Sequence, residues 1–164
     1  MGIVKIYSDG SARGNPDGPG GYGTILQYID NQGRMYEKEM SQGYVKTTNN
    51  RMELMGCIAG FEALNRPCEV EVYSDSKYLI DAFNQNWIDK WVANNWKRPK
   101  TGPVKNVDLW ERLLKAIDGH RVTFNWVKGH DGHPENERCD KLATSAADSG
   151  DLLEDVVYEK DGAD

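Results

Sequence analysis

The sequence lacks three features that would assign a class directly: long apolar runs, internal repeats and low-complexity tracts. Nowhere in the 164 residues is there a stretch near the ~20 apolar side chains that a membrane span needs. The N-terminus shows no charged segment followed by an apolar one, so we expect no secretory leader and a location in the cytoplasm. We therefore expect a globular protein that makes no use of a membrane.

Cysteine is also scarce. Cys57, Cys68 and Cys139 are odd in number, lie far apart and include no C-x-x-C pair. This pattern argues against a disulfide framework and against a cysteine-based zinc site. A zinc site built from His130, His133 and Cys139 lacks a fourth ligand at a familiar spacing. Buried or unreactive thiols are the simplest interpretation.

An excess of positive charge, the usual mark of a nucleic-acid-binding protein, is absent as well, because the formal net charge is −6. The negative charge is concentrated at the end of the chain, where residues 151–164 hold six acidic side chains and one lysine. The first 150 residues are close to neutral, with 19 basic and 20 acidic side chains. Residues 87–110 hold five basic side chains against two acidic ones, so the composition is compatible with a nucleic-acid-binding surface there.

The first half of the chain is rich in β-strand signals. Residues 3–8 favour a strand that Asp9 and Gly10 terminate. Residues 23–28 and 35–44 are separated by turn residues, which predicts a hairpin. Thr48 then supplies a cap for a helix whose apolar residues recur at helical spacing. Three antiparallel strands and a first helix are therefore predicted.

The second half alternates between strands and helices. Strands are expected at 70–74 and 121–127, and helices at 77–83, 107–117 and 134–148. Because parallel crossovers need helical connections, this order indicates an α/β fold with a five-stranded mixed sheet, three antiparallel strands and then two parallel, flanked by helices. Residues 1–150 would form one domain, and the acidic segment 151–164 is expected to be a flexible tail.

Two strands of this predicted sheet end in the same letters, Tyr-Ser-Asp, at Asp9 and Asp75. If the two strands are parallel neighbours, both carboxylates emerge at one carboxyl edge, where open α/β sheets bind ligands. The strand directions bring Glu53 of the first helix and Asp140 of the last helix to the same edge. The loop that holds His130 lies there too. Four acids and one imidazole are thus predicted to converge.

Four carboxylates in one cleft raise each other's pKa unless a cation balances them. An all-oxygen ligand set favours Mg²⁺ or Mn²⁺ over zinc, and paired Mg²⁺ ions suit in-line displacement at phosphorus. The residues therefore indicate metal-assisted phosphodiester hydrolysis. Taken singly, each acid fits a turn or helix-capping role better, and His130 fits a surface loop.

Five sequence blocks carry the candidate residues along the first 150 positions. They are DGS with GNP at 9–16, TTNNRMEL at 47–54, SDS at 74–76, VKNVDLW at 104–110, and the stretch from WVKGH at 126–130 to ERCD at 137–140. Together these blocks resemble bacterial-type ribonuclease HI, of the type 1 ribonuclease H family. The resemblance covers nearly the whole chain to residue 150 and implies the ribonuclease H-like fold.

The resemblance implies an endonuclease that hydrolyses the RNA strand of an RNA/DNA hybrid and leaves 5′-phosphate and 3′-hydroxyl ends. By the same resemblance, Asp9, Glu53, Asp75 and Asp140 would hold two Mg²⁺ ions, with Mn²⁺ as a substitute. His130 would assist proton transfer or product departure, which suits its place between two glycines. A monomer without an obligate protein partner is also implied.

The resemblance further indicates how the hybrid is bound. Sensing RNA requires a group that both donates to and accepts from the 2′-hydroxyl, and asparagine amides do both. The positions that contact the minor groove in the family are here Asn15, Asn49 and Asn50. The positions that hold a phosphate of the DNA strand are here Lys46, Thr48 and Asn106. Helix capping and a chain turn are the structural alternatives for Thr48, Asn49 and Asn15.

The basic stretch 87–105 resembles the protrusion that grips the DNA strand in this family. Lysines attract phosphates, and aromatic rings pack against sugars or bases. At least one of these tryptophans is expected in the core instead, as are Trp110 and Trp126. The predicted contacts of the protrusion are Trp87, Trp91, Trp96, Lys97 and Lys105.

One departure from the family pattern bears on substrate binding. Asp17 is inserted in a loop that usually reads Gly-Asn-Pro-Gly, and it places an extra acid near the substrate path. All four candidate carboxylates are nevertheless present, which disfavours the alternative of a non-catalytic hybrid-binding module of the same fold. A calcium-binding or protein-interaction domain is disfavoured too, since no EF-hand spacing occurs.

Overall fold

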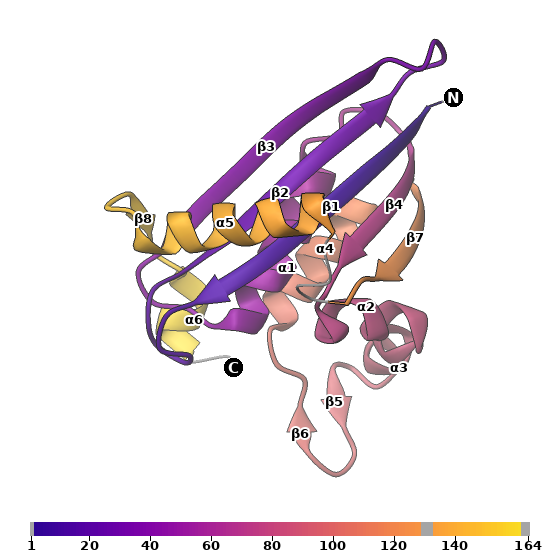
Figure 1. The fold of residues 1–164 in the computed structure, drawn as a ribbon. Coiled ribbons are helices and arrows are strands. Elements are labelled where there is room, and N and C mark those ends of the chain that lie inside the picture. The colour runs from indigo at the N-terminus through magenta and orange to yellow at the C-terminus, as the bar shows by residue number, and fades with distance from the viewer. Residues whose placement is uncertain (1, 129–132, 162–164) are drawn as a thin grey trace.

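The computed structural model describes residues 2–128 and 133–161. Its centre is a six-stranded mixed sheet in the order β7-β4-β1-β2-β3-β8 (Figure 1). The α/β class is confirmed, but the sheet has six strands instead of the predicted five, because a short strand from the acidic end of the chain joins it. The strands are β1 (Ile3–Ala12), β2 (Gly20–Ile29), β3 (Met35–Tyr44), β4 (Glu69–Ser74), β7 (Arg121–Trp126) and β8 (Leu152–Leu153).

The register of the sheet sets the positions of the functional residues. Strands β1, β2 and β3 form an antiparallel meander. Strand β4 lies parallel to β1, and β7 lies parallel to β4, as predicted. The pairing of β1 with β4 runs to Tyr7 opposite Tyr73, so Asp9 and Asp75 each follow two residues later. Both carboxylates therefore leave the sheet at the same edge.

Helices cover both faces of the sheet. Helices α1 (Asn49–Glu62) and α4 (Val107–Ile117) pack on one face, and α5 (Pro134–Asp148) crosses the other (Figure 1). Alternating side chains of β1 serve the two faces, since Ile6 belongs to the larger apolar cluster with α1, and Tyr7 to the smaller one with Cys139 of α5. None of the helices in the described ranges is long and apolar enough to cross a bilayer.

Glycines in β2 let α5 lie unusually close to the sheet. A Cβ atom at Gly23 would lie 2.3 Å from the carbonyl oxygen of Cys139, and one at Gly21 would lie 2.6 Å from that of Ala143. Real side chains do not tolerate such approaches, so glycine is required at both positions. The close packing fixes the middle of α5, where Asp140 follows Cys139.

The basic stretch forms a separate protrusion at the bottom of Figure 1. It consists of α3 (Trp87–Ala93) and a two-stranded ribbon of β5 (Lys97–Arg98) and β6 (Gly102–Pro103), and it follows α2 (Lys77–Asn84), whose Leu79 and Ile80 lie in the core. Neighbouring tryptophan rings join it to the core, with ring centroids 6.3 Å apart for Trp87 and Trp91 and 5.5 Å apart for Trp91 and Trp110. Trp110 is fully buried, as predicted.

Trp126 differs from its predicted place in the core, because 46% of its surface is exposed. It ends β7, which is an edge strand of the sheet, so one side of the ring has no neighbouring strand to cover it. Its indole nitrogen donates to the backbone oxygen of Asp75 over 3.2 Å, and the Lys77 ammonium lies 4.8 Å from the ring centroid. Trp126 therefore borders the carboxylate edge.

Residues 152–161 of the acidic segment pack on the body, which corrects the expectation of a flexible tail for this part of the chain. Leu152 and Leu153 form β8, parallel to β3, and helix α6 (Val156–Asp161) follows. Asp155 and Tyr158 are 9% and 3% exposed. The composition was misleading because one acid of this segment is the partner of a buried arginine, Arg51, and is not a solvated charge.

Candidate active site

Three carboxylates meet at the carboxyl edge of the parallel strands. Asp9 lies near the end of β1, Asp75 follows β4, and Glu53 lies in the second turn of α1. One carboxylate oxygen from each of the three lies within 4.8 Å of the others. The structure thus brings together three of the four acids that strand directions placed at this edge.

Gly10 is the residue that joins Glu53 to Asp9. A Cβ atom at this position would lie 2.5 Å from the backbone nitrogen of Glu53, so only glycine lets α1 approach β1 this closely. The Gly10 amide donates to Asp9 Oδ1 and to Glu53 Oε1, over 2.9 Å in each case. One backbone amide therefore orients two carboxylates.

Two of the three carboxylates, Asp9 and Glu53, have a raised pKa. Burial raises the pKa of Glu53 well above its usual value, and the charges of Asp9 and Asp75 raise it further. Burial, followed by the charge of Asp75, raises the pKa of Asp9 to about 7, although the hydrogen bonds to Glu53 and Gly10 oppose this. Glu53 Oε2 is buried and has no hydrogen-bond partner among the described residues.

Asp140 lies at the same cleft but outside the closest trio. It lines the cleft on α5 together with Asp9 and Asp75, and its charge also contributes to the raised pKa of Asp9. The fourth predicted acid is therefore near the other three, on the opposite face of the sheet from α1. His130, the predicted imidazole, lies outside the described residues.

Two residues that the sequence analysis did not assign to the active site also line this cleft, and one of them, His133, was considered there only as a zinc ligand. His133 precedes α5 and packs against Tyr7 and Tyr73, with ring centroids 5.5 Å and 6.2 Å away. Asn136 donates to the Tyr73 backbone oxygen over 3.4 Å, while its Oδ1 is buried without a described partner. The only sequence signal for either residue is its place in the block between His130 and Asp140.

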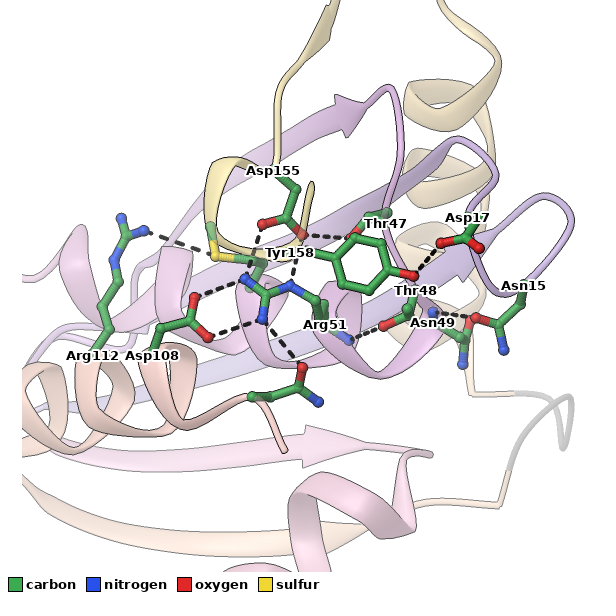
Figure 2. A network of polar contacts seen from close by, with 12 residues as sticks. Asn15, Asp17, Thr47, Thr48, Asn49, Arg51, Asp108, Arg112, Asp155 and Tyr158 are labelled. Carbon is green, nitrogen blue, oxygen red and sulfur yellow. Dashed lines mark hydrogen bonds and ion pairs between the residues drawn. The ribbon is translucent and has the colours of Figure 1, made fainter. Parts of the chain in front are cut away.

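The three predicted minor-groove asparagines gather beside the carboxylates. Asn49 and Asn50 line the same open cleft as Asp9 and Glu53. Asn15 comes from the loop after β1, and its Oδ1 accepts a 3.1 Å hydrogen bond from the Asn49 amide (Figure 2). The loop after β1 and the start of α1 are thus joined at the edge of the cleft.

The three predicted phosphate-binding residues differ in exposure, since one is exposed and two are buried. Lys46 is exposed. Thr48 is buried and caps α1, with its hydroxyl accepting from the Arg51 amide over 3.2 Å. Asn106 is 1% exposed, and its side chain accepts from Arg51 Nη1 and donates to the Tyr78 hydroxyl over 3.2 Å and 3.0 Å. Thr48 and Asn106 therefore have structural roles as well.

Arg51 is the centre of a polar network that the sequence did not reveal (Figure 2). The buried guanidinium makes two hydrogen bonds to Asp108, of 2.9 Å and 2.7 Å, and two to Asp155, of 2.7 Å and 2.9 Å. Burial opposes its charge, but Asp108 and Asp155 together raise the pKa of Arg51 above its usual value. Arg51 therefore links α1, α4 and the C-terminal segment.

The predicted contacts of the protrusion divide into two kinds. Lys97 and Lys105 are exposed and free of described ion pairs, as phosphate-binding side chains require. Trp87, Trp91 and Trp96 are partly buried and pack against the apolar core. Their described contacts are structural, and contact with nucleic acid stays a prediction for all five residues.

The mixed sheet, the helices on both its faces and the acidic cleft at its carboxyl edge define a protein of the ribonuclease H-like fold. A sequence model of the family described as RNase H matches residues 2–148. The chain belongs to the RNase H family, and it is a ribonuclease H enzyme by that membership. The match ends just before the segment that forms β8 and α6.

Individual relatives agree with this assignment. The chain is 65% identical to a ribonuclease H of Lachnoclostridium phytofermentans over 156 residues, which cover 95% of this chain and 99% of that protein. It is 52% identical to a ribonuclease H of Desulforamulus reducens, over 93% of this chain and 92% of the relative. Its structure matches LC9-RNase H1, a type 1 RNase H with the type 2 active-site motif, with a TM-score of 0.80 and 33% identity over 100% of this chain and 82% of that one.

Proposed function

We propose that this chain hydrolyses the RNA strand of RNA/DNA hybrids at the cleft formed by Asp9, Glu53, Asp75 and Asp140. One observation carries the proposal: three carboxylate oxygens lie within 4.8 Å of one another beside Asn49 and Asn50. Acids and 2′-hydroxyl-sensing amides at one cleft suit phosphodiester hydrolysis on an RNA strand. Membership in the RNase H family supports the same substrate.

The residues present fit Mg²⁺. All the candidate ligands are carboxylate oxygens, which are the donors that Mg²⁺ prefers. Glu53 Oε2 is buried without a described partner, and the pKa of both Glu53 and Asp9 is raised, so a cation would relieve an existing imbalance. We propose that the four acids hold two Mg²⁺ ions, with Mn²⁺ as a substitute.

Held by Asp9, Glu53, Asp75 and Asp140, two Mg²⁺ ions would supply the chemistry of an activated water and of charge stabilisation at the leaving oxygen. The contribution of the chain is to fix the acids in place. The Gly10 amide holds Asp9 and Glu53 together, and the ends of β1 and β4 hold Asp9 beside Asp75. Water attack opposite the 3′-oxygen of the scissile bond leaves a 5′-phosphate and a 3′-hydroxyl.

Binding of the hybrid would use the two sides of the cleft. Asn15, Asn49 and Asn50 would contact 2′-hydroxyls in the minor groove, because an amide both donates and accepts. Lys46, Thr48 and Asn106 would hold a phosphate of the DNA strand at the start of α1 and α4. The exposed Lys97 and Lys105 of the protrusion would add salt-sensitive attraction, and Trp87, Trp91 and Trp96 an aromatic surface.

His130 completes the proposal as the group that assists proton transfer or product departure. Its residue type and its place in the block that leads to α5 support this role. The cytoplasmic location, the monomeric state and the absence of an obligate protein partner stay predictions.

The test is cleavage of a labelled RNA/DNA hybrid in Mg²⁺, beside single-stranded RNA, duplex RNA and duplex DNA. We expect cutting of the RNA strand of the hybrid alone, with products that carry a 5′-phosphate and are extended by a polymerase from the 3′-hydroxyl. The Asp75→Asn variant is expected to bind the hybrid without cutting it. Binding without cutting by the unaltered protein would instead favour a non-catalytic hybrid-binding module.

A further inference from the structure

The inserted residue Asp17 is bonded to the last helix of the chain. Tyr158 of α6 is 3% exposed, and its hydroxyl donates to Asp17 Oδ1 (Figure 2). Asp17 has a φ angle of 76°, in the left-handed region that most side chains avoid. The loop therefore holds its inserted acid in a demanding conformation, with the carboxylate turned toward the C-terminal segment.

A second set of bonds ties the same loop to the start of α1. The Asp17 amide donates to the Thr47 carbonyl over 3.2 Å, and the Thr47 amide donates to the Gly18 carbonyl over 3.0 Å. The Thr47 hydroxyl in turn donates to Asp155 Oδ2 over 2.7 Å. Asp155 and Tyr158 thus bond to two adjoining parts of the cleft wall from one short segment.

The two segments held by Asp155 and Tyr158, the loop after β1 and the start of α1, are the ones that carry Asn15 and Asn49. Asn15 lies two residues before Asp17, and Asn49 lies two residues after Thr47. Their own hydrogen bond, from the Asn49 amide to Asn15 Oδ1, joins the two parts at the cleft (Figure 2). Asn15 is exposed, so its position depends on the bonds of its loop.

We propose that Tyr158 and Asp17 are positioning residues for hybrid binding: their bond fixes the Asn15 loop against the start of α1, so that Asn15 and Asn49 face the minor groove together. The inference rests on the proposed function, since it assigns a role to a pair that acts through the asparagines. It also gives the inserted Asp17 a use, because its carboxylate is engaged by Tyr158 and held away from the phosphates of the substrate.

The decisive variant is Tyr158→Phe, which removes one hydroxyl and keeps the buried ring. We expect KM for the hybrid to rise about fivefold while kcat stays within about twofold, because one hydrogen bond to a carboxylate is lost and the metal-binding acids are unchanged. Asp17→Ala is expected to raise KM by a similar factor, and the double variant by no more than either single one.

A stability-matched control separates positioning from loss of stability. Ile117→Val shortens a partly buried side chain at the far end of α4 and is expected to lower the thermal midpoint without changing KM. An equal rise of KM in Ile117→Val, an unchanged KM in Tyr158→Phe, or additive effects in the double variant would each overturn the proposal.

A measurement without substrate keeps this inference distinct from the proposed function. Amide exchange of Asn49, whose N–H donates to Asn15, is expected to become about tenfold faster in Tyr158→Phe and to stay unchanged in Ile117→Val. Unchanged exchange at Asn49 in Tyr158→Phe contradicts the positioning role. Failure of the unaltered protein to cut or bind hybrids contradicts the proposed function, whatever the exchange shows.

Discussion

Two groups of buried and partly buried carboxylates lie near the start of α1, and they differ in what balances their charge. Asp108 and Asp155 surround the guanidinium of Arg51 at 2.7–2.9 Å. Asp9 and Glu53, two members of the cleft trio, have no ion pair among the described residues. Arg51 and Glu53 stand two residues apart on the same helix, yet within residues 2–128 and 133–161 an ion pair is found for Asp108 and Asp155 and not for Asp9 or Glu53.

The difference teaches how to distinguish a structural acid from a functional one. A carboxylate pair with an internal cation fastens elements together, and here it fastens α1, α4 and the C-terminal segment. A carboxylate cluster without one stores repulsion that an added cation can relieve. The unbalanced group is therefore the candidate metal site, and the balanced group is part of the framework that supports it.

The largest expected effect is a loss of cleavage activity when one of the cleft carboxylates is removed. Asp75→Asn should lower hybrid cleavage by at least about a thousandfold, because one ligand of the metal site is lost. The fold should be retained, as judged by circular dichroism. Asp118→Asn, at an exposed acid at the opposite edge of the sheet, should cut at the rate of the unaltered protein. Equal activity in both variants would contradict the metal site.

Breaking the balanced group should act on stability instead. Arg51→Met leaves the buried Asp155 and the partly buried Asp108 without a cation, which we expect to lower the free energy of unfolding by about 3–5 kcal/mol. Urea unfolding at pH 7 measures this. Arg112→Met, which breaks the exposed pair with Glu62, should cost less than about 1 kcal/mol. Similar losses of unfolding free energy in Arg51→Met and Arg112→Met would mean that the buried network stabilises the fold no more than an exposed ion pair does.

Removing a charge from the cleft should raise the free energy of unfolding, whereas breaking the Arg51 network lowers it. Asp9→Asn relieves repulsion, so it should raise the free energy of unfolding in metal-free buffer by on the order of 2 kcal/mol at pH 7. The pKa of Asp9 is raised to about 7 in the folded protein, above its usual 3.8. The unaltered protein therefore loses stability as the pH rises between these values, and the gain from Asp9→Asn should vanish below about pH 4.

The smallest expected effect comes from an exposed balanced acid. Hydrogen bonds from Arg138 lower the pKa of Glu37 below its usual 4.5. Glu37→Gln should cost less than about 1 kcal/mol above that pH, and the cost should disappear as the pH falls through the lowered pKa of Glu37. The pH slope is thus opposite to that of Asp9, and parallel slopes in thermal unfolding would contradict the distinction.

The framework and the acids were predictable because they follow from local signals. The Tyr-Ser-Asp motifs at Asp9 and Asp75, together with strand direction, are enough to place Glu53 and Asp140 at the same edge, although β1 continues past the predicted end at Asp9 to Ala12. The ribonuclease H resemblance added the asparagines and the protrusion, whose tryptophans the structure places against the core.

The Arg51 network and the Tyr158–Asp17 bond could not be predicted, because each joins residues that are far apart in the sequence. Asp155 lies 104 residues from Arg51, and Tyr158 lies 141 residues from Asp17. Nothing local to an acidic segment indicates that one acid will be buried against an arginine. The same limitation explains the expected flexible tail, the missed strand β8, and the exposure of Trp126 on an edge strand.

The most direct test of the metal site is the dependence of unfolding on Mg²⁺. The free energy of unfolding of the unaltered protein should rise steadily with Mg²⁺ concentration at constant ionic strength, since the folded cleft binds the ion and the unfolded chain does not. Asp9→Asn, more stable without metal, should gain little or nothing from Mg²⁺. Equal stabilisation of both proteins, or no stabilisation of the unaltered one, would contradict a metal site at these carboxylates.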